Sequence, residues 1–78
     1  MTLSEVELGN NVVITGCDLP EDSRERMFAL GLVTGQKVSV IRRGIGGDPI
    51  QIRLGATELM LRRVVGNHIF VKMSEAEA

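Results

Sequence analysis

Alternation of apolar and polar residues in three short segments is the feature of this sequence that most restricts its fold. Val38 and Val40 alternate with polar neighbours, and the same two-residue period recurs over 50–54 and 58–62. This period is typical of half-buried β-strands, because successive side chains of a strand point to opposite faces. We therefore expect three strands that each present one apolar face to a common core. Ile41 interrupts the first alternation and predicts a bend or bulge there.

Glycine-rich turns separate these segments and indicate how they connect. Gly55 and Ala56 fit a two-residue hairpin turn, in which glycine takes a positive φ. The stretch 44–49 holds three glycines and an Asp-Pro pair, and a proline disfavours helical backbone in the residue before it. We therefore predict antiparallel hairpins on both sides of segment 50–54.

Two more strands are expected outside this middle region. Residues 12–15 are largely β-branched and suit a strand, while 62–67 is expected to form a short turn. Ile69, Val71 and Met73 then alternate as the inward face of a last strand. The chain thus contains about five short strands.

One helix is predicted over 20–30. It begins with a proline, which suits the first helical turn, and carries acidic residues at the positive end of the helix dipole. Met27 and Leu30 lie three apart and are expected to share the inward face, whereas Phe28 points away from it. Gly31 follows as a left-handed cap.

These elements favour a closed rather than an open arrangement. An open sheet of five short strands with one helix would leave two long bare edges. Curling into a small barrel removes those edges and encloses one core. The predicted fold is mainly β, a small SH3-like barrel of about five antiparallel strands with one inserted α-helix.

Length and cysteine content indicate the class of protein. The 78 residues form one domain, and a core of this size supplies roughly 3 to 5 kcal/mol of stability. Cys17 is the only cysteine, so no disulfide can form within the chain, and we expect it to be a small core residue. A lone cysteine and no recognisable secretory leader predict a cytoplasmic protein. No apolar run is long enough to span a bilayer.

Charge is unevenly distributed along the chain. Residues 35–72 contain seven basic and two acidic side chains, although the whole chain carries a net charge of -1. The simpler interpretation is that the arginines cover the solvent face of the strands. The alternative is a nucleic-acid binder, but such barrels add aromatic stacking platforms and this chain has only two Phe and no Tyr or Trp. Its candidate residues would be Arg42, Arg43, Arg53, Arg62 and Arg63, and we expect no nucleic-acid partner.

Metal ligands and cofactor motifs are sparse. A tight iron or zinc site needs several His, Cys or carboxylate ligands, and this chain has one cysteine and one histidine, His68, which we expect to point outward from its strand. Glu21, Asp22 and Glu25 could hold a weak divalent ion such as Fe(II), but they are more simply partners of the helix dipole. We predict no tight metal and no cofactor.

No catalytic machinery is evident. Nothing in the spacing places Cys17 against His68 as a nucleophile and base, and the loop 44–49 lacks the lysine and following helix of a phosphate-binding P-loop. We expect a protein that is not an enzyme.

The order of these motifs resembles the FeoA family of bacterial ferrous iron transport proteins. The resemblance covers Leu3 to Lys72. Two places depart from the commonest family pattern: Val33 precedes Thr34 where the family more often has a single residue and a proline before the glycine, and Ile45 and Gly46 replace a more usual Pro-Leu pair. The matching pieces are the helix end over 26–32, the strand over 34–40, the Gly-Asp-Pro turn and strand over 47–52, and the strand over 59–63.

The resemblance implies a FeoA-like domain over 1–73. The small polar and acidic residues of 74–78 have no apolar stripe to bury, so we expect a disordered tail there. The resemblance also implies a cytosolic, non-catalytic accessory protein that assists FeoB, the GTP-dependent ferrous iron permease, and reaches the membrane only through that permease. The same barrel is fused to metal-dependent repressors, so a free-standing regulatory module is the alternative, and fold does not separate the two roles.

A partner would be expected on the helix and the glycine-rich loop. Met27 and Leu32 also fit the core, which leaves Phe28 and Ile45 as the better contact residues. The full set of candidate partner-binding residues is Met27, Phe28, Leu32, Ile45, Gly47 and Asp48.

Overall fold

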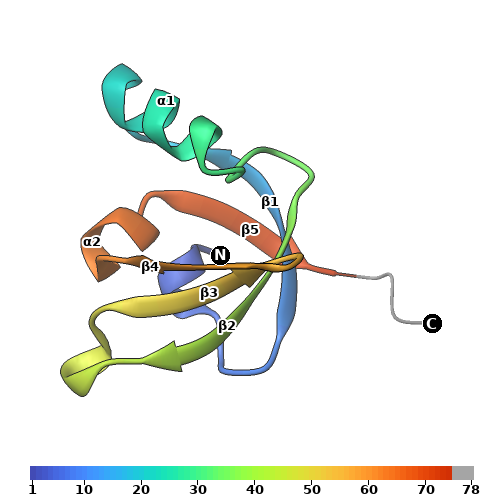
Figure 1. The fold of residues 1–78 in the computed structure, drawn as a ribbon, viewed down its shortest axis with the longest axis vertical. Coiled ribbons are helices and arrows are strands. Elements are labelled where there is room, and N and C mark those ends of the chain that lie inside the picture. The colour runs from blue at the N-terminus through green and yellow to red at the C-terminus, as the bar shows by residue number, and fades with distance from the viewer. Residues whose placement is uncertain (75–78) are drawn as a thin grey trace.

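One curled antiparallel β-sheet forms the body of the protein (Figure 1). The computed structural model describes residues 1–74. Its strands are β1 (Asn11–Cys17), β2 (Lys37–Arg43), β3 (Ile50–Leu54), β4 (Thr57–Leu61) and β5 (Ile69–Met73). They lie in the order β4-β3-β2-β1-β5, and every paired neighbour is antiparallel. The predicted five-stranded antiparallel fold is confirmed.

Short helices fill the connections. The helix predicted over 20–30 is α1 (Glu21–Ala29), inserted between β1 and β2. The turn expected over 62–67 is the one-turn helix α2 (Arg63–Gly66), which links β4 to β5. Two 3₁₀ turns, η1 (Leu3–Glu5) and η2 (Ile45–Gly47), complete the element order.

The apolar faces of the strands meet in a core without aromatic side chains. Alternating burial along β1, β2 and β3 confirms the two-residue period. Both phenylalanines of the chain are exposed, so aliphatic side chains alone fill the core. The core consists of Leu3, Val6, Val12, Ile14, Leu32, Val38, Val40, Ile50, Ile52, Leu54, Leu61, Ile69 and Val71.

Two irregular points of the sheet lie where the sequence predicts them, while a further register shift separates Ile14 from Gly16 in the pairing of β1 with β5. The register between β2 and β3 shifts between Val40 and Arg42, so Ile41 is the bulged residue. Gly55 takes a φ of 59° in the turn that joins β3 to β4. Leu54 and Thr57 flank this turn as register partners, which confirms the two-residue hairpin.

The N-terminal segment packs more tightly than the sequence indicates. Leu3 is fully buried, and the guanidinium of Arg43 donates hydrogen bonds to the carbonyls of Ser4 and Val6. The Ser4 hydroxyl donates to the side-chain carbonyl of Asn67. The N-terminal turn is therefore fastened to both β2 and the end of α2.

Two strand positions were predicted wrongly, and the prediction of a disordered tail falls mostly outside the described residues. Cys17 is exposed although it lies opposite the buried Ile69, because it is the last residue of β1, beyond a register shift between Ile14 and Gly16. Met73 is 46% exposed because it ends β5, beyond the last buried residue of that strand. Ser74, assigned to the tail, donates its backbone N–H to the Asn11 carbonyl at 3.1 Å. The rest of the expected tail, 75–78, lies outside the described residues.

Candidate interaction surface

The C-terminal end of α1 is closed by a Schellman motif. The Gly31 N–H donates to the Phe28 carbonyl at 3.0 Å, and the Leu32 N–H donates to the Met27 carbonyl at 2.9 Å. Gly31 has a φ of 92°, which a residue with a Cβ adopts only with strain. This turn directs Leu32 into the core, where it is 7% exposed.

The rest of α1 projects from the sheet (Figure 1). No residue between Glu21 and Ala29 is fully buried, and Met27 is the one residue of α1 that packs against the core. Leu30 is 44% exposed, so the expectation that it shares an inward face with Met27 is wrong. The reason is the cap: the chain leaves the helix at Leu30, and Leu32 takes the place against the core.

Phe28 is the most exposed aromatic residue of the protein. Its side chain is 71% exposed and lies between two shallow clefts. One cleft runs along the outer side of the helix, where Glu21, Arg24 and Glu25 line it. The other lies between the helix and the end of β1 and is lined by Cys17, Arg24, Leu32, Val33 and Thr34.

The loop between β2 and β3 presents a single apolar tip. Ile45 is fully exposed. Behind it, the Asp48 carboxylate accepts a hydrogen bond from the Arg63 backbone N–H at 2.9 Å. The Arg63 guanidinium donates to the Gly46 carbonyl at 3.3 Å. The Asp48 carboxylate thus makes an intramolecular hydrogen bond, which fastens the loop to the start of α2.

The candidate residues form two separate surfaces rather than one. In Figure 1, α1 lies at the upper end of the molecule, and the loop containing η2 lies at the lower end, with β3, β4 and β5 between them. Phe28 and Ile45 are both exposed, whereas Leu32 is in the core and Met27 is half-buried. Gly47 lies beside Arg63: a Cβ added to this glycine would be 3.5 Å from the Arg63 guanidinium.

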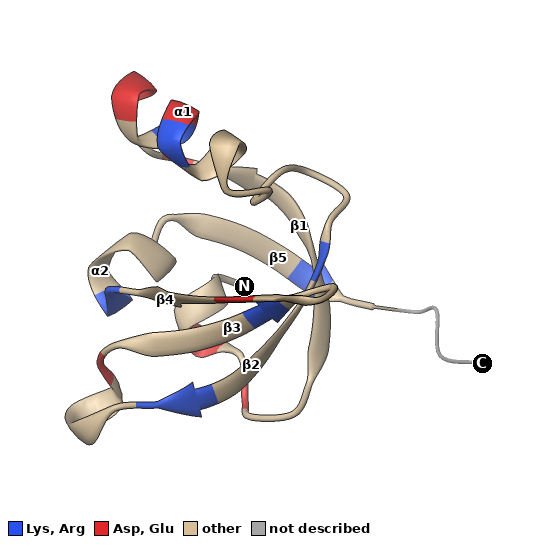
Figure 2. Ribbon diagram, in the orientation of Figure 1, with Lys and Arg blue, Asp and Glu red and all other residues tan. Residues whose placement is uncertain are grey.

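Most arginines of the basic region have partners within the protein. Arg53 forms a 2.9 Å ion pair with Glu58, and this hydrogen bond lowers the pKa of the Glu58 carboxyl. The side chains of Arg43 and Arg63 donate hydrogen bonds to backbone carbonyls. Among residues 1–74, this leaves Arg42 and Arg62 as the two arginines of the sheet region without an ion pair or a side-chain hydrogen bond. Figure 2 shows the resulting scatter of charge over the strands and α2.

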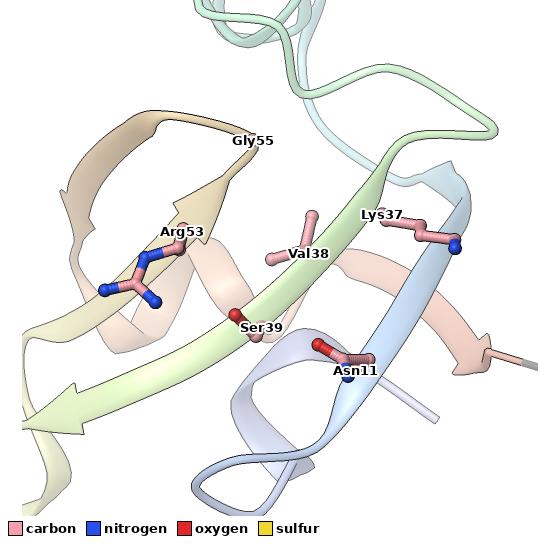
Figure 3. Close-up of a pocket in the computed structure, with 6 residues that line it drawn as sticks. All are labelled: Asn11, Lys37, Val38, Ser39, Arg53 and Gly55. Atoms are coloured by element: carbon pink, nitrogen blue, oxygen red, sulfur yellow. The ribbon is translucent and has the colours of Figure 1, made fainter. Parts of the chain in front are cut away.

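A third cleft lies across β1, β2 and β3. In Figure 3, Lys37 and Arg53 extend away from each other, so the two cations do not converge on one point. The cleft is lined by Asn11, Lys37, Val38, Ser39, Arg53 and Gly55.

Backbone pairing brings the cysteine and the histidine to the same end of the sheet. Cys17 is opposite Ile69 in the register, and the Asp18 N–H donates to the His68 carbonyl at 2.8 Å. His68 is exposed at the turn before β5 rather than within the strand. Within 1–74, no three His, Cys, Asp or Glu side chains gather closely enough to hold a metal ion. In the same range, no helix has the length and apolarity needed to cross a membrane.

Residues 1–73 match the family model of the FeoA domain. The chain belongs to the FeoA family. Among solved structures, the FeoA protein of Chlorobium tepidum is 32% identical, with a TM-score of 0.90 over 100% of this chain and 74% of that one. The FeoA of Stenotrophomonas maltophilia, described as a prokaryotic SH3 domain protein and solved with zinc, is also 32% identical, with a TM-score of 0.80 over 92% of this chain and 89% of that one. The SH3-like fold is thereby confirmed.

Other comparisons are less complete. The iron(II) transport protein A of Clostridium thermocellum is 25% identical with a TM-score of 0.88; the match covers 94% of this chain but only 45% of that one. The manganese regulator SloR, at 14% identity and a TM-score of 0.81, shares the fold alone. No curated protein matches the chain.

Proposed function

We propose that this FeoA-family protein is a non-catalytic accessory module that binds the cytoplasmic region of a FeoB-like iron permease. Family membership supports the link to ferrous iron transport. For the Stenotrophomonas maltophilia relative, a role as an activating factor of ferrous iron transport has been suggested. In this proposal the protein acts in the cytoplasm and reaches the membrane only through the permease.

The exposed Phe28 carries the proposal. A 71% exposed aromatic side chain on a helix with no buried residue contributes little to this fold. Aromatic residues flanked by clefts commonly anchor protein interfaces. Glu21 and Glu25 beside it favour a partner segment that combines an apolar side chain with a basic one.

Ile45 supplies a second, separate contact in this proposal. Its exposed side chain projects from a loop that Asp48 and Arg63 hold in place. Met27 and Leu32 act indirectly by fixing the end of α1, and Gly47 and Asp48 do the same for the loop. Contacts on both α1 and the loop would let the partner fix the orientation of the whole domain.

Calorimetric titration with the purified cytoplasmic region of the permease tests both contacts. We expect Phe28→Asp and Ile45→Asp each to weaken binding about tenfold or more, because truncating an interface anchor commonly costs at least that much. Leu8→Asp changes an apolar side chain that is 57% exposed in the turn before β1, and it should bind like the unaltered protein. Unchanged affinity of both test variants, with intact circular dichroism, would contradict the proposal.

A further inference from the structure

The sheet has two edges, and only one of them is covered. Along β5, the Val71 N–H donates to the Met1 carbonyl at 2.9 Å, and Thr2 forms a β-bridge with Phe70. On the far side of β4, no backbone group of Thr57–Leu61 bonds to another element in the described chain. The strand order ends at β4, which pairs with β3 alone among the described strands. The curling therefore leaves one open edge, where complete closure was expected.

The hairpin turn determines which backbone groups point to this edge. Leu54 and Thr57 close the two-residue turn, so their backbone groups face one another. Because an antiparallel ladder alternates, the backbone groups of Leu59 and Leu61 also face β3, and those of Glu58 and Met60 face outward.

Arg62 continues this outward series. Its φ of -67° and ψ of 143° are extended. Its carbonyl accepts the N–H of Val65 at 3.0 Å and that of Gly66 at 3.2 Å within α2. Its own N–H has no backbone acceptor among residues 1–74 and is available to a further strand.

We propose that β4 pairs antiparallel with β4 of a second copy of this chain, with Met60 opposite Met60 on the two-fold axis. In this register Glu58 of each copy lies opposite Arg62 of the other. Centring the axis on Glu58 or on Arg62 would instead place like charges opposite one another, which destabilises strand pairs. Charge complementarity thus selects one register.

The side chains on the outer face suit this pairing. Met60 is 65% exposed in the single chain and would meet its own copy at the axis. The Glu58 side chain is 45% exposed and already binds Arg53 on one side, so the partner's Arg62 would join it from the other. Such pairs add little individually, and the dimer is expected to be weak and dependent on concentration.

Symmetry explains why association would stop at two copies. The contact is the same surface on both chains, so it closes on itself. A head-to-tail chain would require the β5 edge, which Met1 and Thr2 cover.

Sedimentation equilibrium and dilution-dependent amide shifts of the full chain test the proposal. We expect a monomer–dimer equilibrium in the millimolar range or tighter, with shifts concentrated over 57–63. Arg62→Glu should raise the dissociation constant about tenfold, because it places Glu58 opposite a glutamate in both pairs. Arg24→Glu changes an exposed arginine on α1, away from the β4 edge, and is the matched control.

Mixing two variants gives a sharper result. Glu58→Arg and Arg62→Glu should each associate poorly alone, but an equimolar mixture should form a heterodimer in which both charge pairs are attractive. Met60→Pro removes an outward N–H without removing a bond to β3, and it should abolish association. A chain that stays monomeric at millimolar concentration, an equal effect of the Arg24 control, or a mixture that fails to associate would overturn the proposal.

Discussion

At the scale of single residues, Gly44 occupies the most restricted glycine position in the described chain. A Cβ there would lie 2.3 Å from the Asp48 carbonyl oxygen and 2.7 Å from Cδ of Pro49. Since both neighbours belong to the loop that carries Ile45, the absence of a side chain at residue 44 allows the loop to fold back on itself. Glycine is required here for space and not for a positive φ.

Replacing this glycine should therefore destabilise the protein. We expect Gly44→Ala to lower the free energy of unfolding by about 1 to 3 kcal/mol, the usual cost of overpacking. Gly16→Ala is the matched control, because its nearest neighbour would be Phe70 at 4.0 Å. Urea denaturation of the two variants measures the difference, and equal midpoints would show that the loop rearranges without cost.

Arg43 is the one arginine of the basic region whose main role is to hold the N-terminus. Arg43→Met keeps the length of the side chain but leaves the carbonyls of Ser4 and Val6 without this donor. We expect a loss of about 1 to 3 kcal/mol, against less than about 0.5 kcal/mol for the exposed Arg42→Met. Chemical denaturation measures both, and similar losses would show that the Arg43 hydrogen bonds add no net stability.

At the scale of elements, α1 depends on its C-terminal cap more than on packing. The helix buries no residue completely, and Met27 alone packs against the core from within its bounds. Sequence reasoning correctly identified the helix, its glycine cap and the exposed Phe28. It misplaced Leu30, because helical periodicity applies only up to the residue at which the chain leaves the helix.

Gly31→Ala tests the importance of this cap. A residue with a Cβ at a φ of 92° is strained, and we expect a loss of about 1 to 2 kcal/mol together with reduced helical circular dichroism. Gly31→Asn should lose less, since asparagine tolerates left-handed backbone better. Equal stability of the alanine variant and the unaltered protein would contradict the role assigned to the Schellman motif.

At the scale of the whole molecule, two carboxylates make the free energy of unfolding depend on pH. The hydrogen bond from the Thr2 N–H lowers the pKa of Glu5, and the hydrogen bond from Arg53 lowers the pKa of Glu58. A carboxyl with a lowered pKa in the folded state contributes stability above its unfolded pKa and loses that contribution as pH falls through the folded value. Stability should therefore fall as pH drops below about 4.5.

Thermal unfolding between neutral and acidic pH measures this dependence. Glu58→Gln should reduce the fall in unfolding temperature at acidic pH (the acidic limb of the curve), because glutamine cannot titrate. Glu7→Gln changes an exposed glutamate without a side-chain hydrogen bond or ion pair among residues 1–74, and should leave the limb unchanged. Parallel acidic limbs for the unaltered protein and Glu58→Gln would show that the Arg53 pair contributes nothing to pH-dependent stability.

Local patterns in the sequence were sufficient to determine the strands, the hairpin at Gly55, the bulge at Ile41 and the helix stop at Gly31. Each depends on the backbone conformation of neighbouring residues, which side-chain alternation and glycine report directly. The same patterns, taken in order, were also enough to indicate the family.

Tertiary structure alone decided which of those residues are close together. It separated Phe28 from Ile45, used Asp48 and Arg43 for internal hydrogen bonds, and covered the β5 edge but not the β4 edge. These outcomes depend on contacts between segments far apart in the chain, such as Ser4 with Asn67. Periodicity identifies the apolar face of an element but not the element that packs against it, so the candidate surfaces emerged only once the sheet had curled around its core.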